Sequence, residues 1–187
     1  METSDDELVL RIRGGDEAAF EAMVARWNEP ILQLATRLTG DFEEAKDVRQ
    51  MALLKLYRGL ASFEGRSRFS TWIYRVVLNL CRDRQRGANV RTRALEESVR
   101  EKDGDYVLEE TGFHVARDRE LAGIVAHAVL ELPASEREVV VLRHYHDLPF
   151  PVIAEVVEAP VTTVKSRMAK GLALLRTRLA QLQGDPS

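Results

Sequence analysis

Hydroxyl and basic side chains gather near the C-terminus, in the segment TTVKSRMAKG at residues 162–171. From Pro160 to Arg178 the chain has five basic residues and no acidic one. The apolar side chains share one face of a helical wheel, namely Val161, Val164, Met168, Leu172, Leu175 and Leu179. The polar residues outside that face can bind base edges and phosphates of duplex DNA: Thr162, Thr163, Lys165, Ser166, Arg167 and Lys170. A solvated helix face is the simpler interpretation, but the absence of acids and a preceding short helix favour DNA.

A second basic segment combines arginines with aromatic residues. From Arg66 to Arg93 it holds eight arginines and one acid, Asp83. In a helix, a polar stripe would run along one side through Arg75, Asn79, Arg82 and Arg86. Trp72 stands at the edge of this stripe, beside a loop with Phe63, Arg66, Arg68 and Phe69. Unpaired bases stack on aromatic rings while cations follow their backbone, so the combination indicates nucleic acid. Either aromatic residue alone would be interpreted as core.

A third surface is predicted on the segment 43–60. One half of its helical wheel is apolar and is expected in the core: Val48, Ala52, Leu53, Leu56, Tyr57 and Leu60. The other half holds Asp47, Gln50, Met51, Leu54 and Arg58. Two large apolar residues on that half, Met51 and Leu54, indicate either a surface for a partner protein or a wider core that meets the preceding helix. The sequence leaves both interpretations open.

Helices must position these residues, because apolar residues recur at steps of three and four and strand patterns are almost absent. We expect helices at about 16–38, with a kink or break at Pro30, at about 43–60, and from Ser70 or Thr71 to about 86. Further helices are expected at about 118–130, 135–146, 150–157 and 161–181, with Ser135 and Glu138 forming a capping box. The predicted fold class is all-α, with two small helical domains joined by a linker, the C-terminal one a helix-turn-helix. The predicted domains are residues 1–87 and 118–187, and the acidic linker is 88–117.

The overall composition is that of an ordinary globular protein, with a formal net charge of −3. The single cysteine, Cys81, lies in an apolar run and is interpreted as a core residue, and one cysteine fits a reducing compartment. The N-terminus lacks signal-peptide features and no apolar run could span a membrane, so we expect a cytoplasmic protein without membrane insertion. His144 and His146 would not face each other in a helix, and no phosphate loop or nucleophile motif is found. The sequence therefore predicts no metal, no cofactor and no enzyme.

Two long segments resemble one known family. LPASEREVVVLRHYHDLPFPVIAEVVEAPVTTVKSRMAKGLALLRTRL resembles region four, the promoter-binding C-terminal domain, of extracytoplasmic-function (ECF) sigma factors. DFEEAKDVRQMALLKLYRGLASFEGRSRFSTWIYRVVLNLCRDRQR resembles their region two. The resemblance covers about 16–87 and 118–181. It implies a factor that binds core RNA polymerase, through the largest and second-largest subunits, and directs promoter-specific initiation. It also implies promoter DNA as a partner and an anti-sigma factor as a further one.

The resemblance assigns a role to each predicted surface. Region four of the family reads the minus-35 element as duplex, which here would use Thr162, Thr163, Lys165, Ser166, Arg167 and Lys170. Region two melts the minus-10 element and holds a flipped base, which here would use Phe63, Arg66, Ser67, Arg68, Phe69, Ser70, Trp72, Arg75, Asn79, Arg82 and Asp83. It also docks on the clamp of the largest polymerase subunit, which here would use Asp47, Gln50, Met51 and Leu54.

Four residues depart from the family pattern, and two of them, Pro149 and Pro151, replace more usual polar cap residues. Met51 stands where the family usually has an acidic residue, which makes the docking surface more apolar. Glu158 stands where the turn of the helix-turn-helix usually has glycine, so this residue must avoid or tolerate a positive φ. The main alternative is a stand-alone two-domain helix-turn-helix transcriptional regulator. A second alternative is a helical adaptor whose basic faces bind acidic proteins.

Overall fold

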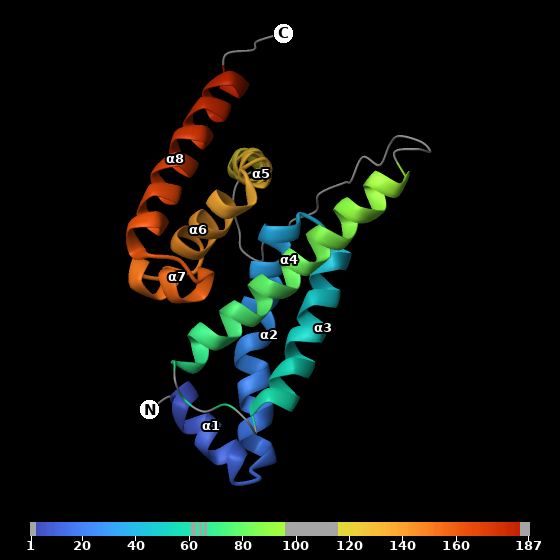
Figure 1. Ribbon diagram of the computed structural model, residues 1–187, viewed down its shortest axis with the longest axis vertical. Coiled ribbons are helices and arrows are strands. Elements are labelled where there is room, and N and C mark those ends of the chain that lie inside the picture. The colour runs from blue at the N-terminus through green and yellow to red at the C-terminus, as the bar shows by residue number, and fades with distance from the viewer. Residues whose placement is uncertain (1–2, 61–62, 64, 66, 96–115, 184–187) are drawn as a thin grey trace. The chain divides into compact units, whose positions relative to one another are not determined.

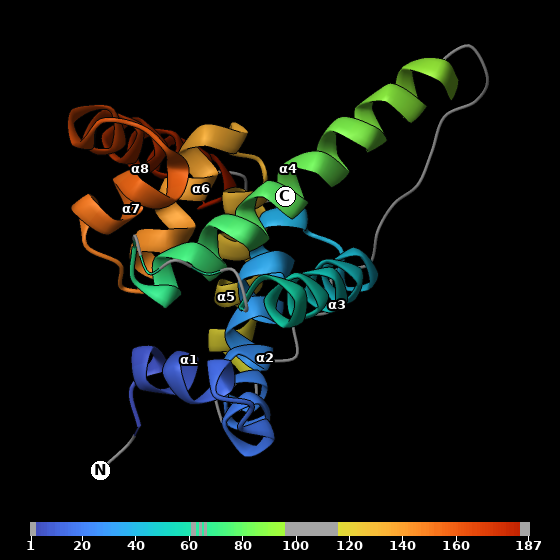
Figure 2. The same ribbon diagram turned by 60° about the horizontal axis from the view of Figure 1, so that its bottom comes forward.

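The computed structural model describes residues 3–60, 63, 65, 67–95 and 116–183, and these residues form eight helices and no strand. The chain divides into two compact units, Met1–Asp103 (unit 1) and Gly104–Ser187 (unit 2). Unit 1 contains α1 to α4 and unit 2 contains α5 to α8 (Figures 1 and 2). The predicted all-α fold class with two helical parts is confirmed.

Unit 1 is built around a pair of long helices, α2 (Glu17–Thr39) and α3 (Phe42–Gly59), which lie side by side in both views (Figures 1 and 2). The longest helix, α4 (Phe69–Leu95), packs across both of them. The short helix α1 (Asp5–Arg13) packs mainly on α2. All four helices contribute to one core, whose largest fully buried side chains include Leu8, Met23, Leu34, Leu56, Phe69, Ile73 and Leu78.

Aspartates begin both long helices. The carboxylates of Asp16 and Asp41 accept hydrogen bonds from the backbone N–H groups of Ala19 and Glu44, at 3.1 and 2.9 Å. These bonds satisfy donors that the first turn of a helix would otherwise leave unpaired. Gly40 ends α2 with φ 76°, a left-handed conformation that glycine adopts without steric penalty. The tight reversal of the chain at Gly40 and Asp41 places α3 against α2.

Three features of unit 1 differ from the sequence-based expectation. α1 is not predicted, because its apolar pattern is short and charged residues surround it. α2 continues through Pro30, so of the predicted kink or break the break is absent. α4 extends to Leu95, so the first part of the range assigned to the linker is helical. Residues 96–115, which include the centre of that predicted linker, lie outside the described residues. Cys81 is buried, as predicted.

Unit 2 contains α5 (Ala116–Leu130), α6 (Ala134–His144), α7 (Phe150–Val157) and α8 (Val161–Gln183). The long α8 packs on the other three helices of the unit, mainly on α6 and α7. Its core is aliphatic and includes Val139, Val141, Leu142, Ile153, Val156 and Val164. The short α7, a tight turn and α8 form the predicted helix-turn-helix.

Two sequence-based predictions about helix ends in unit 2 have different outcomes. The capping box predicted for α6 is wrong, because Pro133 occupies the N-cap and the hydroxyl of Ser135 bonds instead to the carboxylate of Glu136, at 2.7 Å. Glu158, at the end of α7, does adopt the left-handed conformation expected of a glycine there, with φ 57° and ψ 49°. Within the described part of the chain, no helix is both long and apolar enough to span a membrane.

Candidate nucleic-acid and polymerase interfaces

Four aromatic rings meet at the start of α4. Phe69, the first residue of this helix, is fully buried, and its ring centroid lies 5.8, 6.0 and 5.6 Å from those of Trp27, Phe63 and Trp72. Phe63 is also largely buried, at 9% exposed, whereas Trp72 is partly exposed. The fully buried ring of Phe69 has no free face for a base. Of the predicted stacking residues, the structure therefore leaves Trp72 accessible and gives Phe69 a supporting position.

The indole of Trp72 lies against the last turn of α3. A Cβ atom added at Gly59 would stand only 3.0 Å from Cζ2 and 3.3 Å from Cη2 of this indole. Contacts this short are tighter than nearly all Cβ contacts in proteins, so a side chain at position 59 would require the indole to move by a few tenths of an ångström. The helix on one side and the aromatic cluster on the other thus hold the ring of Trp72.

The predicted polar stripe is present on α4. Asn79 and Asp83 are exposed, and Arg75 and Arg82 are partly exposed. Asp83 accepts a hydrogen bond of 2.6 Å from Arg86, so it orients a neighbouring cation. In the loop before the helix, Arg68 is exposed and Ser67 is partly exposed, as is Ser70 in the first turn. Arg66, the remaining residue of the predicted minus-10 set, lies outside the described residues.

The predicted docking residues share the exposed side of α3. Asp47 and Gln50 are exposed, and so are the two apolar residues, with Met51 at 42% and Leu54 at 38%. These exposures do not support the interpretation of a wider core, because neither apolar side chain is buried against the preceding helix. Asp47 also accepts a hydrogen bond of 3.1 Å from Arg84, which ties α3 to α4.

The sequence placed one residue of α3 on the wrong side. Tyr57 was expected in the core, but it is 67% exposed and its ring meets the edge of Phe20 with centroids 5.4 Å apart. Phe42, in the first turn of α3, is 47% exposed. Residue type misleads here, since aromatic rings are usually buried. The exposed side of α3 is therefore more apolar than the sequence indicated.

α8 presents most of the predicted duplex-binding residues to solvent. Thr162, Lys165 and Ser166 are exposed, and Thr163 and Arg167 are partly exposed. The opposite side is buried through Val164 and Leu175. Leu172, which the wheel assigned to the core, is 48% exposed, whereas Gly171 is buried. The reason is a close approach of α6, since a Cβ atom at Gly171 would lie 2.8 Å from Cγ2 of Val140.

Lys170 makes an ion pair inside unit 2. Its Nζ lies 2.6 Å from Oε1 of Glu136 on α6, and the carboxylate of Glu136 is only 5% exposed. The hydrogen bonds from Lys170 and from the hydroxyl of Ser135 lower the pKa of Glu136, which keeps this carboxyl group ionised. Lys170 thus has an acidic partner within unit 2, while its own side chain stays 63% exposed.

Comparison with known families agrees with this division. The Sigma-70 region 2 family matches residues 23–91, and the Sigma-70 region 4 family matches residues 122–175. The first match covers most of α2, all of α3 and most of α4, and the second covers the helix-turn-helix. α1 precedes both matches.

Relatives that align over most of the chain are also sigma factors. The RNA polymerase sigma-H factor of Pseudomonas aeruginosa is 34% identical over 170 residues, which cover 88% of each chain. The ECF RNA polymerase sigma factor SigW of Bacillus subtilis is 32% identical over 191 residues, covering 97% of this chain and 100% of SigW.

A solved structure of CnrH in complex with the cytosolic domain of CnrY matches with a TM-score of 0.69 at 26% identity, over 97% of this chain and 99% of that one. The sigma factor RpoE of Bartonella quintana, solved with the anti-sigma factor NepR, shares the fold with a TM-score of 0.70 at 18% identity, over 86% of this chain and 96% of that one. The two regions in one chain, together with whole-length relatives, show that this chain belongs to the ECF family of RNA polymerase sigma factors.

Proposed function

We propose that this chain, as a sigma factor that directs promoter-specific initiation by RNA polymerase, divides promoter recognition between its two units. Unit 1 binds core polymerase and captures unpaired bases of the minus-10 element. Unit 2 reads the minus-35 element as duplex. The observation that supports this division is that each Sigma-70 region match falls on the unit whose exposed surface has the corresponding chemistry. A stand-alone regulator would have no use for the first of these regions.

Trp72 is the proposed stacking platform for an unpaired base. Its indole is partly exposed and is held by Gly59 and the aromatic cluster, so little freedom is lost when a base stacks on it. Arg82 and Asn79 follow along α4 and supply a cation and an amide for the DNA strand. Phe63 and Phe69 act beneath this surface by fixing the indole.

The first two turns of α8 are the proposed duplex reader. Thr162, Ser166 and Arg167 offer hydroxyl and guanidinium groups at the N-terminal end of a helix that is packed along its other side. We assign Lys170 a different task, which is to anchor α8 to α6 through Glu136. Arg167→Ala is therefore expected to lower the slope of log affinity against log salt by about one, and Lys170→Ala by much less.

The exposed side of α3 is the proposed polymerase-binding surface. Met51 and Leu54 supply apolar area, and Asp47 and Gln50 supply polar contacts around it. A mixed surface of this kind is typical of an interface between proteins that also exist apart. Because CnrH is solved with a protein partner, we further propose that an anti-sigma partner regulates this chain by covering exposed surfaces. The chain would then act in the cytoplasm as an initiation factor and carry out no catalysis of its own.

Run-off transcription with purified core polymerase on a pool of promoter fragments tests the proposal. New start sites are expected with this chain, and Arg167→Ala or Trp72→Ala should remove them. Arg176→Ala is the matched control for the first variant, because Arg176 is exposed on α8 about two and a half helical turns beyond Arg167 and on the opposite side of the helix. No new start site, together with duplex binding in the absence of polymerase, would overturn the proposal in favour of a stand-alone regulator.

A further inference from the structure

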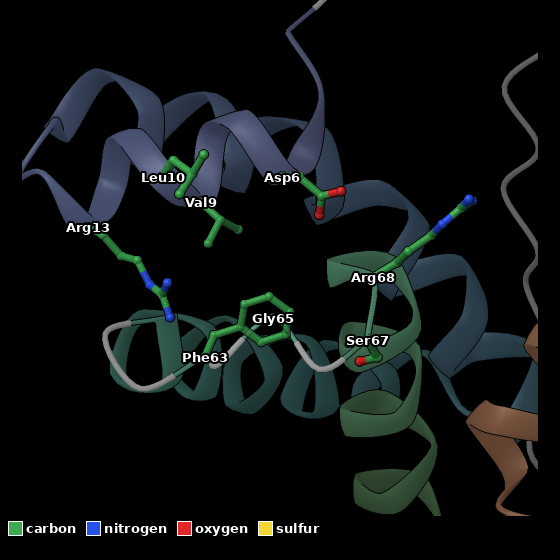
Figure 3. Close-up of a pocket in the computed structure, with 8 residues that line it drawn as sticks. All are labelled: Asp6, Val9, Leu10, Arg13, Phe63, Gly65, Ser67 and Arg68. Atoms are coloured by element: carbon green, nitrogen blue, oxygen red, sulfur yellow. The ribbon is translucent and has the colours of Figure 1, made fainter.

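An open pocket of about 430 Å³ lies between α1 and the loop before α4 (Figure 3). Its lining comes half from the helix and half from the loop: Asp6, Val9, Leu10, Arg13, Phe63, Gly65, Ser67 and Arg68. The helix half lies before residue 23, where the Sigma-70 region 2 match begins. Neither the family match nor the surfaces described above give α1 a function.

The two walls of the pocket are apolar. The ring of Phe63 forms one wall, and Val9 and Leu10 face it from α1 (Figure 3). Leu10 is 66% exposed, so this part of α1 has little packing of its own. The ring of Phe63 is braced from behind by Phe69 and Trp72, at centroid distances of 6.0 and 5.8 Å. A slot between an aromatic ring and aliphatic side chains suits a flat, unsaturated ring.

Polar groups stand at the two ends of this slot. Arg13 lies at one end, and Asp6, Ser67 and Arg68 lie toward the other (Figure 3). A carboxylate only accepts hydrogen bonds, so Asp6 favours a ligand that carries N–H groups at its edge. The two arginines at the margins can bind phosphates on either side of the ligand. A nucleobase within a DNA strand has all of these features: a flat ring, polar edges and flanking phosphates.

α1 is held firmly enough to position Asp6. The hydroxyl of Ser4 caps the helix by accepting a hydrogen bond from the N–H of Glu7 at 3.2 Å. Arg26 of α2 binds the carboxylate of Asp5 and the carbonyl of Thr3, both at 2.7 Å. Burial, with a smaller contribution from Asp5, raises the pKa of Tyr74 on α4 to about 12. Asp5 thus faces inward as an anchor while its neighbour Asp6 reaches the pocket.

We propose that α1 completes a binding slot for an unpaired DNA base, and that Asp6 selects a base with an exocyclic amino group. Adenine, cytosine and guanine carry an exocyclic amino group that can donate such a hydrogen bond, whereas thymine offers only its N3–H, flanked by two carbonyl oxygens that the carboxylate repels, and is disfavoured. This inference rests on the proposed capture of unpaired bases by unit 1, and it adds a specificity residue from outside the Sigma-70 region 2 match.

The test compares binding of oligo-dC, oligo-dA and oligo-dT of equal length to the full chain assembled with core polymerase, by fluorescence anisotropy. Wild-type chain should prefer oligo-dC and oligo-dA to oligo-dT. Asp6→Ala should reduce this preference by about tenfold, the effect of losing one good base contact. Glu7→Ala is the matched control, because it removes an exposed acid from the same helical turn and does not line the pocket. It should raise affinity for all three oligonucleotides alike and leave the preference unchanged.

Leu10→Asp is a second variant that places a negative charge in the slot itself, and it should weaken binding of all three oligonucleotides. Equal effects of Asp6→Ala and Glu7→Ala on the preference would overturn the inference, because Asp6 would then act only through its charge. The proposed function can be judged separately by run-off transcription. If Trp72→Ala abolishes initiation while Asp6→Ala changes no base preference, the slot is wrong and the initiation factor stands.

Discussion

In unit 1 the residues assigned to DNA are supported by aromatic rings that meet edge to face, whereas in unit 2 the recognition helix is supported by aliphatic side chains and one ion pair. Unpaired bases require an accessible flat ring, and Trp72 can offer one because Phe69 and Gly59 hold it from behind. Duplex DNA instead requires a helix in a fixed orientation, which Gly171 and Glu136 provide for α8. The form of DNA that each unit is proposed to bind thus corresponds to the type of packing beneath its surface.

Phe69→Ala should have the largest effect, and only on unit 1. Removing a fully buried phenylalanine ring from a core is expected to lower the free energy of unfolding by about 3–5 kcal/mol. Both tryptophans of the chain, Trp27 and Trp72, are in unit 1, so the urea dependence of tryptophan fluorescence reports on this unit. Phe42→Ala, at an exposed ring, should change the same quantity by less than about 0.5 kcal/mol. Equal losses for the two variants would mean that Phe69 does not support the aromatic cluster.

Gly171→Ala should destabilise unit 2 and leave unit 1 unchanged. The new methyl group would meet Cγ2 of Val140 at 2.8 Å, and forcing α6 and α8 apart is expected to lower the free energy of unfolding by about 1–3 kcal/mol. Far-UV circular dichroism in urea should show an earlier transition, while tryptophan fluorescence should not. Gly123→Ala, in α5 of the same unit, is the control, because nothing lies within 4 Å of the added atom. That variant should instead stabilise the helix by about 0.5–1 kcal/mol.

Glu158→Gly tests the turn of the helix-turn-helix. At φ 57° a residue with a side chain is strained, so glycine should raise the free energy of unfolding of unit 2 by up to about 1 kcal/mol. Glu155→Gly makes the same chemical change within α7 and should lower stability by about 1 kcal/mol. The opposite signs of these two changes are the diagnostic result, measured by thermal unfolding. A decrease in stability for both would show that the left-handed turn is not strained.

Glu136→Gln should have the smallest effect, and its size should depend on pH. The pKa of Glu136 is lowered in the folded state from an ordinary value of 4.5 by the hydrogen bonds from Lys170 and Ser135. The unfolded state therefore binds the proton more tightly, and the stabilisation is present above about pH 4.5 and is lost as the pH falls further. At neutral pH we expect a loss below about 1 kcal/mol, because Lys170 is largely exposed.

Urea unfolding of wild type and Glu136→Gln, compared at neutral pH and below pH 4.5, checks this prediction. The difference in the free energy of unfolding between wild type and Glu136→Gln should be smaller at the lower pH. Glu131→Gln is the control, because Glu131 pairs with Arg178 of α8 at 2.6 Å but is more exposed than Glu136. A difference that stays constant across this pH range would show that the charge of Glu136 does not stabilise α8.

The sequence predicts the long helices well, because strong apolar periodicity survives in each of them. It is less reliable where a contact between distant residues overrides the local pattern. Leu172 and Tyr57 have the residue types of core positions, yet the approach of α6 at Gly171 and the path of α3 leave both exposed. Ser135 has the spacing of an N-cap, but its hydroxyl bonds to Glu136.

For the candidate surfaces, too, the sequence predicts local patterns but not contacts between distant residues. The exposed polar residues of α3, α4 and α8 follow from helical wheels, since the buried side of each helix is strongly apolar. The pairing of Lys170 with Glu136 could not be predicted, because 34 residues separate the two in the sequence. The role that we propose for α1 could not be predicted for a similar reason. Its nine residues show a weak pattern alone, and only the fold brings Asp6 opposite the loop of Phe63.

The contact between Gly59 and Trp72 has a mechanical consequence. The same helix, α3, carries the proposed polymerase-binding residues on its exposed side and touches the indole at its last turn. The helix α3 thus connects the proposed polymerase-binding residues to the proposed base-stacking residue. A tilt of α3 on docking would also shift the indole of Trp72. The methyl group of a Gly59→Ala variant would push the indole of Trp72 away from α3. It would displace the proposed base-stacking ring while leaving the exposed side chains of α3 chemically unchanged.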